Sequence, residues 1–262
     1  MRAIIVAAGR GRRLGPETAE IPKCMVSVGG RPILHRQLDA LAAAGADEVV
    51  IVRGYLGDRI APPPSLPAHV RVRFVENSAW ASNNILASLL YAEREMTEGF
   101  LFTYSDIVFA TEHARDIAAS TADVALIVDR LWQEAYLGRV HHPVSEAELV
   151  AVAGTADGPR VRRVGKRVVP AAEAAGEFSG LAKVSPAGAA ALVDVWRRAL
   201  ASGLDQPFGQ AATLRQAYLS DAFNQMADEG VALVPVFVDG RWREIDTEED
   251  LGRAHAVVDD WG

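Results

Sequence analysis

The first stretch of the chain, up to Lys23, restricts the possible folds more than any other. Residues 2–8 read Arg-Ala-Ile-Ile-Val-Ala-Ala, an almost continuous apolar run typical of a strand buried on both faces of a parallel sheet. The run ends at Gly9 and Gly11, and glycines let backbone N–H groups approach phosphate oxygens because they have no Cβ. Three cationic side chains follow: Arg12, Arg13 and Lys23. We predict a strand followed by an anion-binding loop; the alternative is an ordinary glycine-rich turn with solvated arginines.

The spacing of this loop is more specific than its composition. It reads Gly9-x-Gly11-x-Arg13-Leu14-x-Pro16-x-Thr18-x-x-x-Pro22-Lys23 and resembles the signature of nucleotidyltransferases that join a nucleoside triphosphate to a sugar phosphate, a choline phosphate or a phosphonate. No Lys-Ser/Thr pair follows the glycines, as a P-loop requires, and the third glycine of the dinucleotide-binding fingerprint is missing. Arg12 stands where the family usually has Ser or Thr, and Glu17 where it usually has an aliphatic residue.

Strand and helix patterns alternate in the first half of the chain. Further apolar runs predict strands at 48–52, 70–75, 100–104 and 121–128. A helical stripe opened by Pro32 and ended near Gly45 separates the first two strands, which implies a right-handed crossover and a parallel sheet. We predict an α/β fold with a Rossmann-like, mixed and mainly parallel sheet, helices on both faces, and a small β-rich subdomain that binds the acceptor.

The second half is richer in turns, aromatic residues and charged residues. Its patterns predict a β-ribbon at 148–152 and 160–164, helices at 186–200 and 210–229, strands at 231–238 and 241–245, and a last helix capped by Thr247. We divide the chain into a nucleotide-binding core at 1–128, acceptor-binding strands and loops at 129–185, and a segment at 186–262 that completes the core and carries a second metal-binding aspartate.

Polar amides and hydroxyls are concentrated between the third and fourth predicted strands. Ser82 or Asn83 can cap a helix there. Plain helix capping is the alternative to a nucleotide-binding site. Capping, however, needs only one residue of this type. The segment is similar to the helix start of choline-phosphate and phosphonate cytidylyltransferases. That resemblance implies a pyrimidine pocket made by the backbone of Ala7 and Ala8 with Asn83 and Ser88, Ser82 being a further nucleotide contact, and a preference for CTP over UTP.

Two aspartates follow predicted strands. Asp106 comes soon after the predicted strand at 100–104. Open α/β sheets bind ligands at the carboxyl ends of their strands, which is where Asp106 would lie. Asp246 follows the last predicted strand. As isolated residues they are also explained as a turn former and as an acidic residue near a helix start. The resemblance implies that both are catalytic and hold Mg²⁺. It assigns the phosphates of the nucleotide to Gly9, Gly11, Arg12, Arg13 and Lys23, with Arg13 and Lys23 counted as catalytic.

Seven residues of the second half are candidates for binding the acceptor. Their order and spacing resemble a set found in phosphonate cytidylyltransferases: Asp129, Trp132, Tyr136, Arg139, Glu148, Lys166 and Glu177. The resemblance implies that a small phosphonate, such as hydroxyethyl-, aminoethyl- or formylphosphonate, attacks the α-phosphorus of CTP and displaces pyrophosphate. A choline phosphate acceptor, with its cation against Trp132 and Tyr136, is the alternative. Arg139 and Lys166 disfavour it, because a choline pocket gains nothing from nearby cations.

Two other residue types invite a functional reading that we do not adopt. His141 and His142 are adjacent and precede Pro143, so we interpret them as a surface turn rather than as metal ligands. The single cysteine, Cys24, excludes an internal disulfide and fits a reducing compartment. We expect it to be a small buried residue.

Composition excludes several partners. The 262 residues are 50% hydrophobic with a net charge of −7, so the chain can bury a full core, and nucleic acid is not expected as a partner. No apolar run approaches the length of a membrane span, and no signal peptide is recognisable. We therefore expect a cytoplasmic protein without a membrane partner, either a monomer or a homodimer.

Three other classes of protein share parts of these patterns. A sugar-1-phosphate nucleotidyltransferase would carry a longer sugar-binding middle. A catalytically silent nucleotide-binding module would most simply have lost Lys23, Asp106 or Asp246, and all three are present. A dinucleotide-binding protein would need an acidic residue after the second strand, where Arg53 stands.

Overall fold

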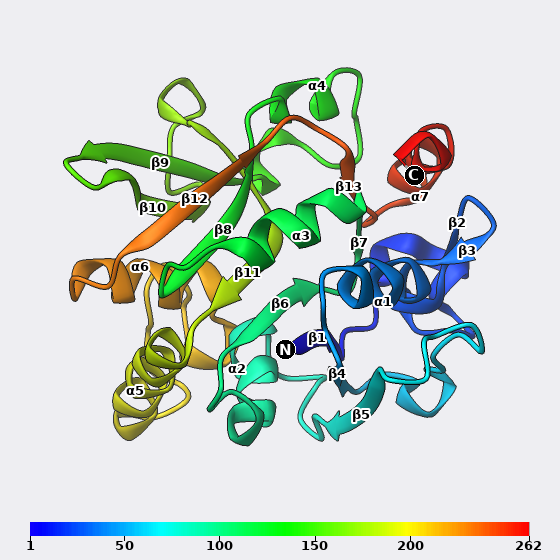
Figure 1. Ribbon diagram of the computed structural model, residues 1–262, viewed down its shortest axis with the longest axis horizontal. Coiled ribbons are helices and arrows are strands. Elements are labelled where there is room, and N and C mark those ends of the chain that lie inside the picture. The colour runs from blue at the N-terminus through cyan, green and yellow to red at the C-terminus, as the bar shows by residue number, and fades with distance from the viewer. Residues whose placement is uncertain (262) are drawn as a thin grey trace.

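A computed structural model describes residues 1–261. Nine strands of these residues form one mixed sheet, with β1 (Arg2–Ala7) near its centre (Figure 1). β1 pairs in parallel with β4 (Glu48–Arg53) and β6 (Phe100–Tyr104), and β4 pairs in parallel with β5 (Arg71–Glu76). The other strands of this sheet are β8 (Val124–Asp129), β9 (Glu148–Thr155), β10 (Gly158–Lys166), β11 (Gly176–Val184) and β12 (Leu233–Val238). Their order is β10-β9-β11-β6-β1-β4-β5, with β8 paired to β11 and β12 paired to β8.

Helices cover both faces of the sheet, which confirms the predicted α/β class. Their bounds are α1 (Ile33–Ala43) and α3 (Thr111–Ala119) on one face, and α2 (Ile85–Leu89), α5 (Pro186–Ser202) and α6 (Leu219–Asp228) on the other. In β1, Ala3 and Ile5 pack in the cluster that includes α1 and α3, whereas Ile4 and Val6 pack in the cluster of α2, α5 and α6. The strand is apolar throughout because both of its faces are buried.

The segment at 129–185 extends the central sheet. β9 and β10 form the predicted antiparallel ribbon, and β11 pairs antiparallel with β6, β8 and β9. One hydrophobic cluster joins side chains from before and after residue 129, among them Phe102, Leu126, Val150 and Phe178. The predicted acceptor-binding strands therefore share a core with the nucleotide-binding half.

The C-terminal segment returns to the carboxyl end of β6. β13 (Trp242–Glu244) pairs antiparallel with β7 (Ile107–Phe109), and the Ile245 N–H donates to the Asp106 carbonyl at 2.8 Å. α7 (Glu248–His255) then begins with Thr247 as its cap, as predicted. This connection brings Asp246 beside Asp106, although the two lie far apart in the sequence. The remaining short elements are β2 (Ser27–Val28), β3 (Arg31–Pro32) and α4 (Trp132–Tyr136).

Two predicted helix starts were wrong. α2 begins after Asn84 and has no side-chain cap, because the Ser82 hydroxyl donates to the Ala79 carbonyl and Asn83 bonds with Asn77. The helix predicted from residue 210 begins only at Leu219, in α6, because the Asp221 carboxylate accepts the Gln210 and Tyr218 N–H groups and holds the preceding segment as a loop.

The helices of this fold are of ordinary length for a globular domain. α5, with 17 residues, is the longest in the described chain. Nowhere in residues 1–261 does a helix combine the length and the apolarity that crossing a bilayer requires.

Candidate active site

A cavity of about 380 Å³ opens at the carboxyl ends of β1 and β6. It is lined by the glycine loop after β1, the start of α2, the β6–β7 turn, β11 and the end of β13. Open α/β sheets bind ligands at this end of their strands, and the volume lies in the range of small-molecule sites. The segments that the sequence marked as functional therefore meet around one cavity.

The glycine loop packs against the stem of Lys23. Gly11 has φ +66°, a left-handed conformation that favours glycine. A Cβ at this position would lie 2.9 Å from Lys23 Cδ. The Lys23 side chain therefore lies along the loop, and its ammonium group reaches Asp106 and Asp246.

The Lys23 ammonium bridges the two predicted metal ligands. Its Nζ lies 2.6 Å from Asp106 Oδ2 and also donates to Asp246 Oδ1, while the Arg13 guanidinium donates to Asp246 Oδ2. Burial alone would lower the pKa of Lys23, but the charges of Asp106 and Asp246 outweigh it and raise that pKa. Burial would raise the pKa of Asp246, and Lys23 and Arg13 instead hold it below its usual range. The four residues predicted to be catalytic, Arg13, Lys23, Asp106 and Asp246, thus form one charged cluster, here called the catalytic quartet.

This cluster has the oxygen ligands that a divalent cation requires. Asp106 Oδ1 is buried and has no hydrogen-bond partner among residues 1–261, and a cation, the Lys23 ammonium, already lies between the two carboxylates. Glu244 lies on the same side, where burial and the charges of Asp246 and Asp106 raise its pKa well above the usual value. Carboxylate oxygens are the ligands that Mg²⁺ prefers, so the residues fit the predicted metal.

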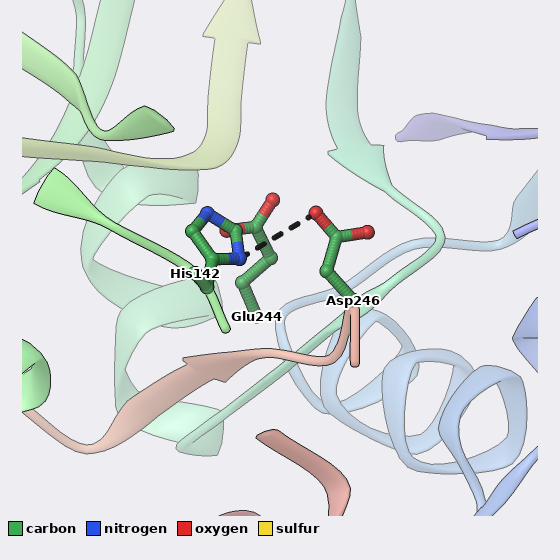
Figure 2. A group of neighbouring side chains, drawn as sticks. All are labelled: His142, Glu244 and Asp246. Carbon is green, nitrogen blue, oxygen red and sulfur yellow. Dashed lines mark ion pairs between the residues drawn. The ribbon is translucent and has the colours of Figure 1, made fainter. Parts of the chain in front are cut away.

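His142 belongs to this site, and the prediction that it lies in a surface turn was wrong. Its side chain is fully buried, and Figure 2 shows that it points toward Glu244 and Asp246. Nε2 lies 3.3 Å from Glu244 and Nδ1 3.7 Å from Asp246. Ligand atoms of the three residues lie within 4.8 Å of one another, close enough for a metal ion. The sequence pattern missed His142 because contacts from the C-terminal segment cover it.

The opposite end of the cavity is polar and uncharged. Asn83, Asn84 and Ser88 line it together with Trp80. Behind them the buried side chain of Asn77 bonds with both Asn83 and Ser88. Amides and hydroxyls of this kind can bond with the edge of a nucleobase.

A third wall of the cavity is acidic. Burial raises the pKa of Glu148 to about 7 and the pKa of Glu177 to about 8. Glu177 Oε1 accepts the Tyr136 hydroxyl at 2.7 Å, whereas Glu177 Oε2 and Ser179 Oγ are buried without a hydrogen-bond partner in the described chain. Lys166 is the cation of this wall; its Nζ lies 5.2 Å from the centre of the Tyr218 ring. The wall therefore leaves polar atoms without partners in the described chain, which a ligand could bind.

Comparison with known proteins identifies the family. The family model of the MobA-like NTP transferase domain matches residues 3–144. The chain belongs to this family of nucleotidyltransferases. Its match spans the glycine loop, Lys23, the Asn83 region and Asp106, so the recognised motifs and the cavity coincide.

Relatives of this NTP transferase include several cytidylyltransferases. A CTP:phosphoglutamine cytidylyltransferase of Campylobacter jejuni is 26% identical over 258 residues, which cover 96% of this chain and 98% of the relative. A 2-aminoethylphosphonate cytidylyltransferase of Lancefieldella rimae is 34% identical over 113 residues, or 42% of this chain and 45% of the relative. The solved CTP:phosphocholine cytidylyltransferase of Streptococcus pneumoniae has a TM-score of 0.75 at 21% identity, covering 98% of each chain. This chain therefore has the same fold as the solved enzyme.

Most predicted nucleotide-binding residues of the transferase line the cavity. They are Ala7, Gly9, Gly11, Arg12, Arg13, Lys23, Asn83, Ser88 and Asp106. Ala8 and Ser82 do not. The Ala8 carbonyl accepts the Tyr55 N–H, and the Ser82 side chain is exposed beside the cavity.

The predicted acceptor residues of the transferase divide into two groups. Glu148, Lys166 and Glu177 line the cavity. The other four stand behind it: Asp129 accepts the Trp242 indole N–H, Trp132 and Tyr136 pack in a small hydrophobic cluster, and Arg139 pairs with Asp250 at 2.6 Å. Their contacts support the wall, and their side chains do not line the cavity.

Other lining residues had no signal in the sequence. They include Trp80, Tyr104, Glu146, Ser179, Tyr218 and Glu244. Glu244 lies two residues before the predicted metal ligand Asp246, and this spacing is a signal that could have indicated it.

Proposed function

We propose that this transferase is a CTP-dependent cytidylyltransferase that transfers CMP to a small phosphonate and releases pyrophosphate. The observation that carries the proposal is that the Lys23, Asp106 and Asp246 cluster, the polar residues around Asn83 and the acidic wall at Glu177 line the same cavity. Such an arrangement separates a base site, a phosphate site and an acceptor site. The cytidylyltransferase that aligns over nearly the whole chain supports CTP as the donor.

The glycine loop and its cations would bind the triphosphate. Backbone N–H groups at Gly9 and Gly11 suit phosphate oxygens, and Arg13 offers a planar donor group to the β- and γ-phosphates. Lys23 would contact the α-phosphate, which gains charge in the transition state. These positive groups offset the repulsion between two anionic substrates.

Asp106 and Asp246 would hold Mg²⁺. When bound, the ion supplies Lewis-acid stabilisation of the charge on phosphate oxygens. The unpartnered Asp106 Oδ1 and the cation already between the two carboxylates support this assignment.

The reaction needs alignment more than proton transfer. A phosphonate oxygen of the acceptor attacks the α-phosphorus of CTP. As the new P–O bond forms, the bond from the α-phosphorus to the oxygen that bridges to the β-phosphorus breaks, and pyrophosphate leaves with that electron pair. No general base is required because the phosphonate dianion is already a nucleophile, so the protein contributes orientation and positive charge.

The acidic wall indicates which acceptors suit the site. Glu177 Oε2 and Ser179 Oγ lack hydrogen-bond partners within the described chain, and a ligand with N–H or O–H groups would bond with them. Aminoethyl- and hydroxyethylphosphonate carry such groups, whereas the trimethylammonium of choline has none. The predicted cation cage also loses support, because Trp132 and Tyr136 are buried behind the wall.

A phosphorylated amide is the second candidate acceptor. The observation in its favour is the alignment of the phosphoglutamine enzyme over 96% of this chain. The amino group of its amino-acid tail would meet the same polar atoms, so the donor and phosphate sites stay as proposed.

The test is pyrophosphate release with Mg²⁺, each of the four nucleoside triphosphates and a panel of acceptors. The panel contains 2-aminoethylphosphonate, 2-hydroxyethylphosphonate, choline phosphate, phosphoglutamine and glucose 1-phosphate. Release with CTP and a phosphonate supports the proposal, and release with CTP and phosphoglutamine alone selects the second candidate. Turnover that prefers UTP or GTP, or that needs the sugar phosphate, contradicts it.

A further inference from the structure

Asn77 is a buried amide beneath the proposed base pocket, and every one of its polar positions is occupied. Its side chain is 1% exposed. Nδ2 donates to Asn83 Oδ1 and to Ser88 Oγ, each at 2.9 Å. Oδ1 accepts the Ala79 N–H at 3.0 Å and Asn83 Nδ2 at 3.1 Å. An amide has two donor hydrogens and two acceptor lone pairs, so Asn77 has no group left for a ligand.

The backbone determines which way this amide faces. A backbone N–H can only donate, so the Ala79 N–H requires the oxygen of Asn77 on its side. The nitrogen of Asn77 must then face Asn83 and Ser88. Because that nitrogen only donates, Asn83 has to present its own oxygen to Asn77. The orientation of the Ala79 N–H thus determines the orientation of the Asn77 amide, which in turn determines that of the Asn83 amide.

Asn83 consequently faces the cavity as a donor. Its Oδ1 accepts from Asn77 Nδ2 and from the Ser88 hydroxyl, at 2.9 and 3.1 Å, which uses both lone pairs. One hydrogen of Asn83 Nδ2 bonds to Asn77, and the other has no partner among residues 1–261. Ser88 accepts from Asn77, donates to Asn83 and keeps one lone pair. Since Asn83 and Ser88 both line the cavity, the pocket offers one donor beside one acceptor.

We propose that Asn77 is a positioning residue that selects cytosine by holding Asn83 in this orientation. The inference rests on the proposed use of CTP. Cytosine presents an acceptor at N3 beside a donor at its 4-amino group, whereas uracil presents a donor at N3 beside an acceptor at O4. In the same pose, the free N–H of Asn83 and the free lone pair of Ser88 complement cytosine and oppose uracil. Leaving such groups unpaired in a buried site carries a large penalty.

The test is the ratio of kcat/KM for CTP to kcat/KM for UTP. In N77D both side-chain atoms are acceptors, so Asn83 Oδ1 and Ser88 Oγ lose the donor that Asn77 Nδ2 supplies, and the orientation of the Asn83 amide is no longer fixed. We expect the ratio to fall by a factor of about ten or more. The matched control is S78D, which adds the same charge at the adjacent exposed position and touches no bond of the network; its ratio should equal that of the wild type.

The outcomes separate the two proposals. A wild-type enzyme that does not prefer CTP refutes the proposed function. A wild-type enzyme that prefers CTP, with an unchanged ratio in N77D, refutes the positioning role. If N77D does not fold, N77A removes the Asn77 donor to Asn83 Oδ1 and leaves Ser88 in place, and an unchanged ratio in that variant equally refutes the role. A loss of activity with both nucleotides alike would show only a structural contribution and contradict the inference.

Discussion

At the scale of single residues, the proposed phosphate site of this transferase has one ammonium group between two carboxylates. Lys23 is buried with Asp106 and Asp246 as partners. Removing a partner of a buried charge leaves an uncompensated charge, which costs more than the pair gains. The quartet should therefore respond to mutation as a unit, with non-additive effects.

Asp106→Asn is expected to lower the rate of pyrophosphate release by about 100-fold or more, because the metal loses a ligand and Lys23 loses a counter-charge. Turnover with saturating CTP, Mg²⁺ and acceptor measures the effect. Asp239→Asn is the matched control, since Asp239 is half exposed and its ion-pair partner within the described chain is Arg130 at the surface. A rate within threefold of the wild type would rule out Asp106 as a metal ligand. A threefold change corresponds to only about 0.6 kcal/mol in the activation free energy.

Glu177 should make the stability of the protein depend on pH. Burial raises its pKa from 4.5 to about 8, so between these values the folded state binds a proton that the unfolded state has released. The free energy of unfolding therefore falls as pH rises from about 4.5 to about 8.

Glu177→Gln removes that proton equilibrium. Relative to the wild type, the melting temperature of E177Q is expected to rise steadily between pH 5 and pH 8, by several degrees at the upper end. Differential scanning calorimetry at four pH values tests this. A difference that stays constant with pH would mean that Glu177 does not titrate in this range.

At the scale of elements, the loop after β1 is shaped by close packing as well as by backbone conformation. Gly11 and Gly30 both have positive φ angles, +66° and +71°. A Cβ at Gly11 would press on the Lys23 stem, whereas a Cβ at Gly30 meets no atom within 4 Å. Alanine substitutions at these two positions therefore distinguish the effect of backbone strain, which both share, from displacement of the Lys23 side chain, which only Gly11 would cause.

Gly11→Ala and Gly30→Ala should each cost about 1 kcal/mol or more in the free energy of unfolding. Only Gly11→Ala should also lower kcat, because it displaces the Lys23 side chain. Urea unfolding and pyrophosphate release measure the two effects. Equal loss of activity in both variants would attribute the effect to stability alone.

At the scale of the whole molecule, the sheet does not divide at residue 129. β8 pairs with β11 and β12, and β6 pairs with β11, so the first half alone would expose the edges of both strands. The large hydrophobic cluster also draws residues from both halves. The site depends on this continuity, because its phosphate cluster needs Asp246 and its acidic wall needs β9 and β11.

A fragment of residues 1–128 is therefore expected not to fold cooperatively. Urea titration followed by circular dichroism should show no sigmoidal transition for the fragment and a single one for the full chain. A cooperative transition in the fragment would show that the nucleotide-binding half is an independent domain.

Most of the fold could be predicted from the sequence because its strands and helices have strong local patterns. The apolar run of β1 indicates burial on both faces, and the alternation of strands with helices indicates a sheet covered on both sides. The two failures, at the starts of α2 and α6, occurred where side chains bond outside the predicted helix: Asn83 bonds with Asn77, and Asp221 holds the Gln210 N–H as well as the start of α6. Such bonds leave no local trace.

The sequence by itself determined the family, the anion-binding loop and the chemical types at the site, because these depend on residue identity and short spacing. Only the tertiary structure decided which side chains face the cavity. Trp132 and Arg139 match a motif yet support the wall from behind, while His142 and Asn77 became part of the site through contacts with segments far away or with a single backbone N–H. The direction of a side chain depends on what packs around it, and packing is a property of the whole fold.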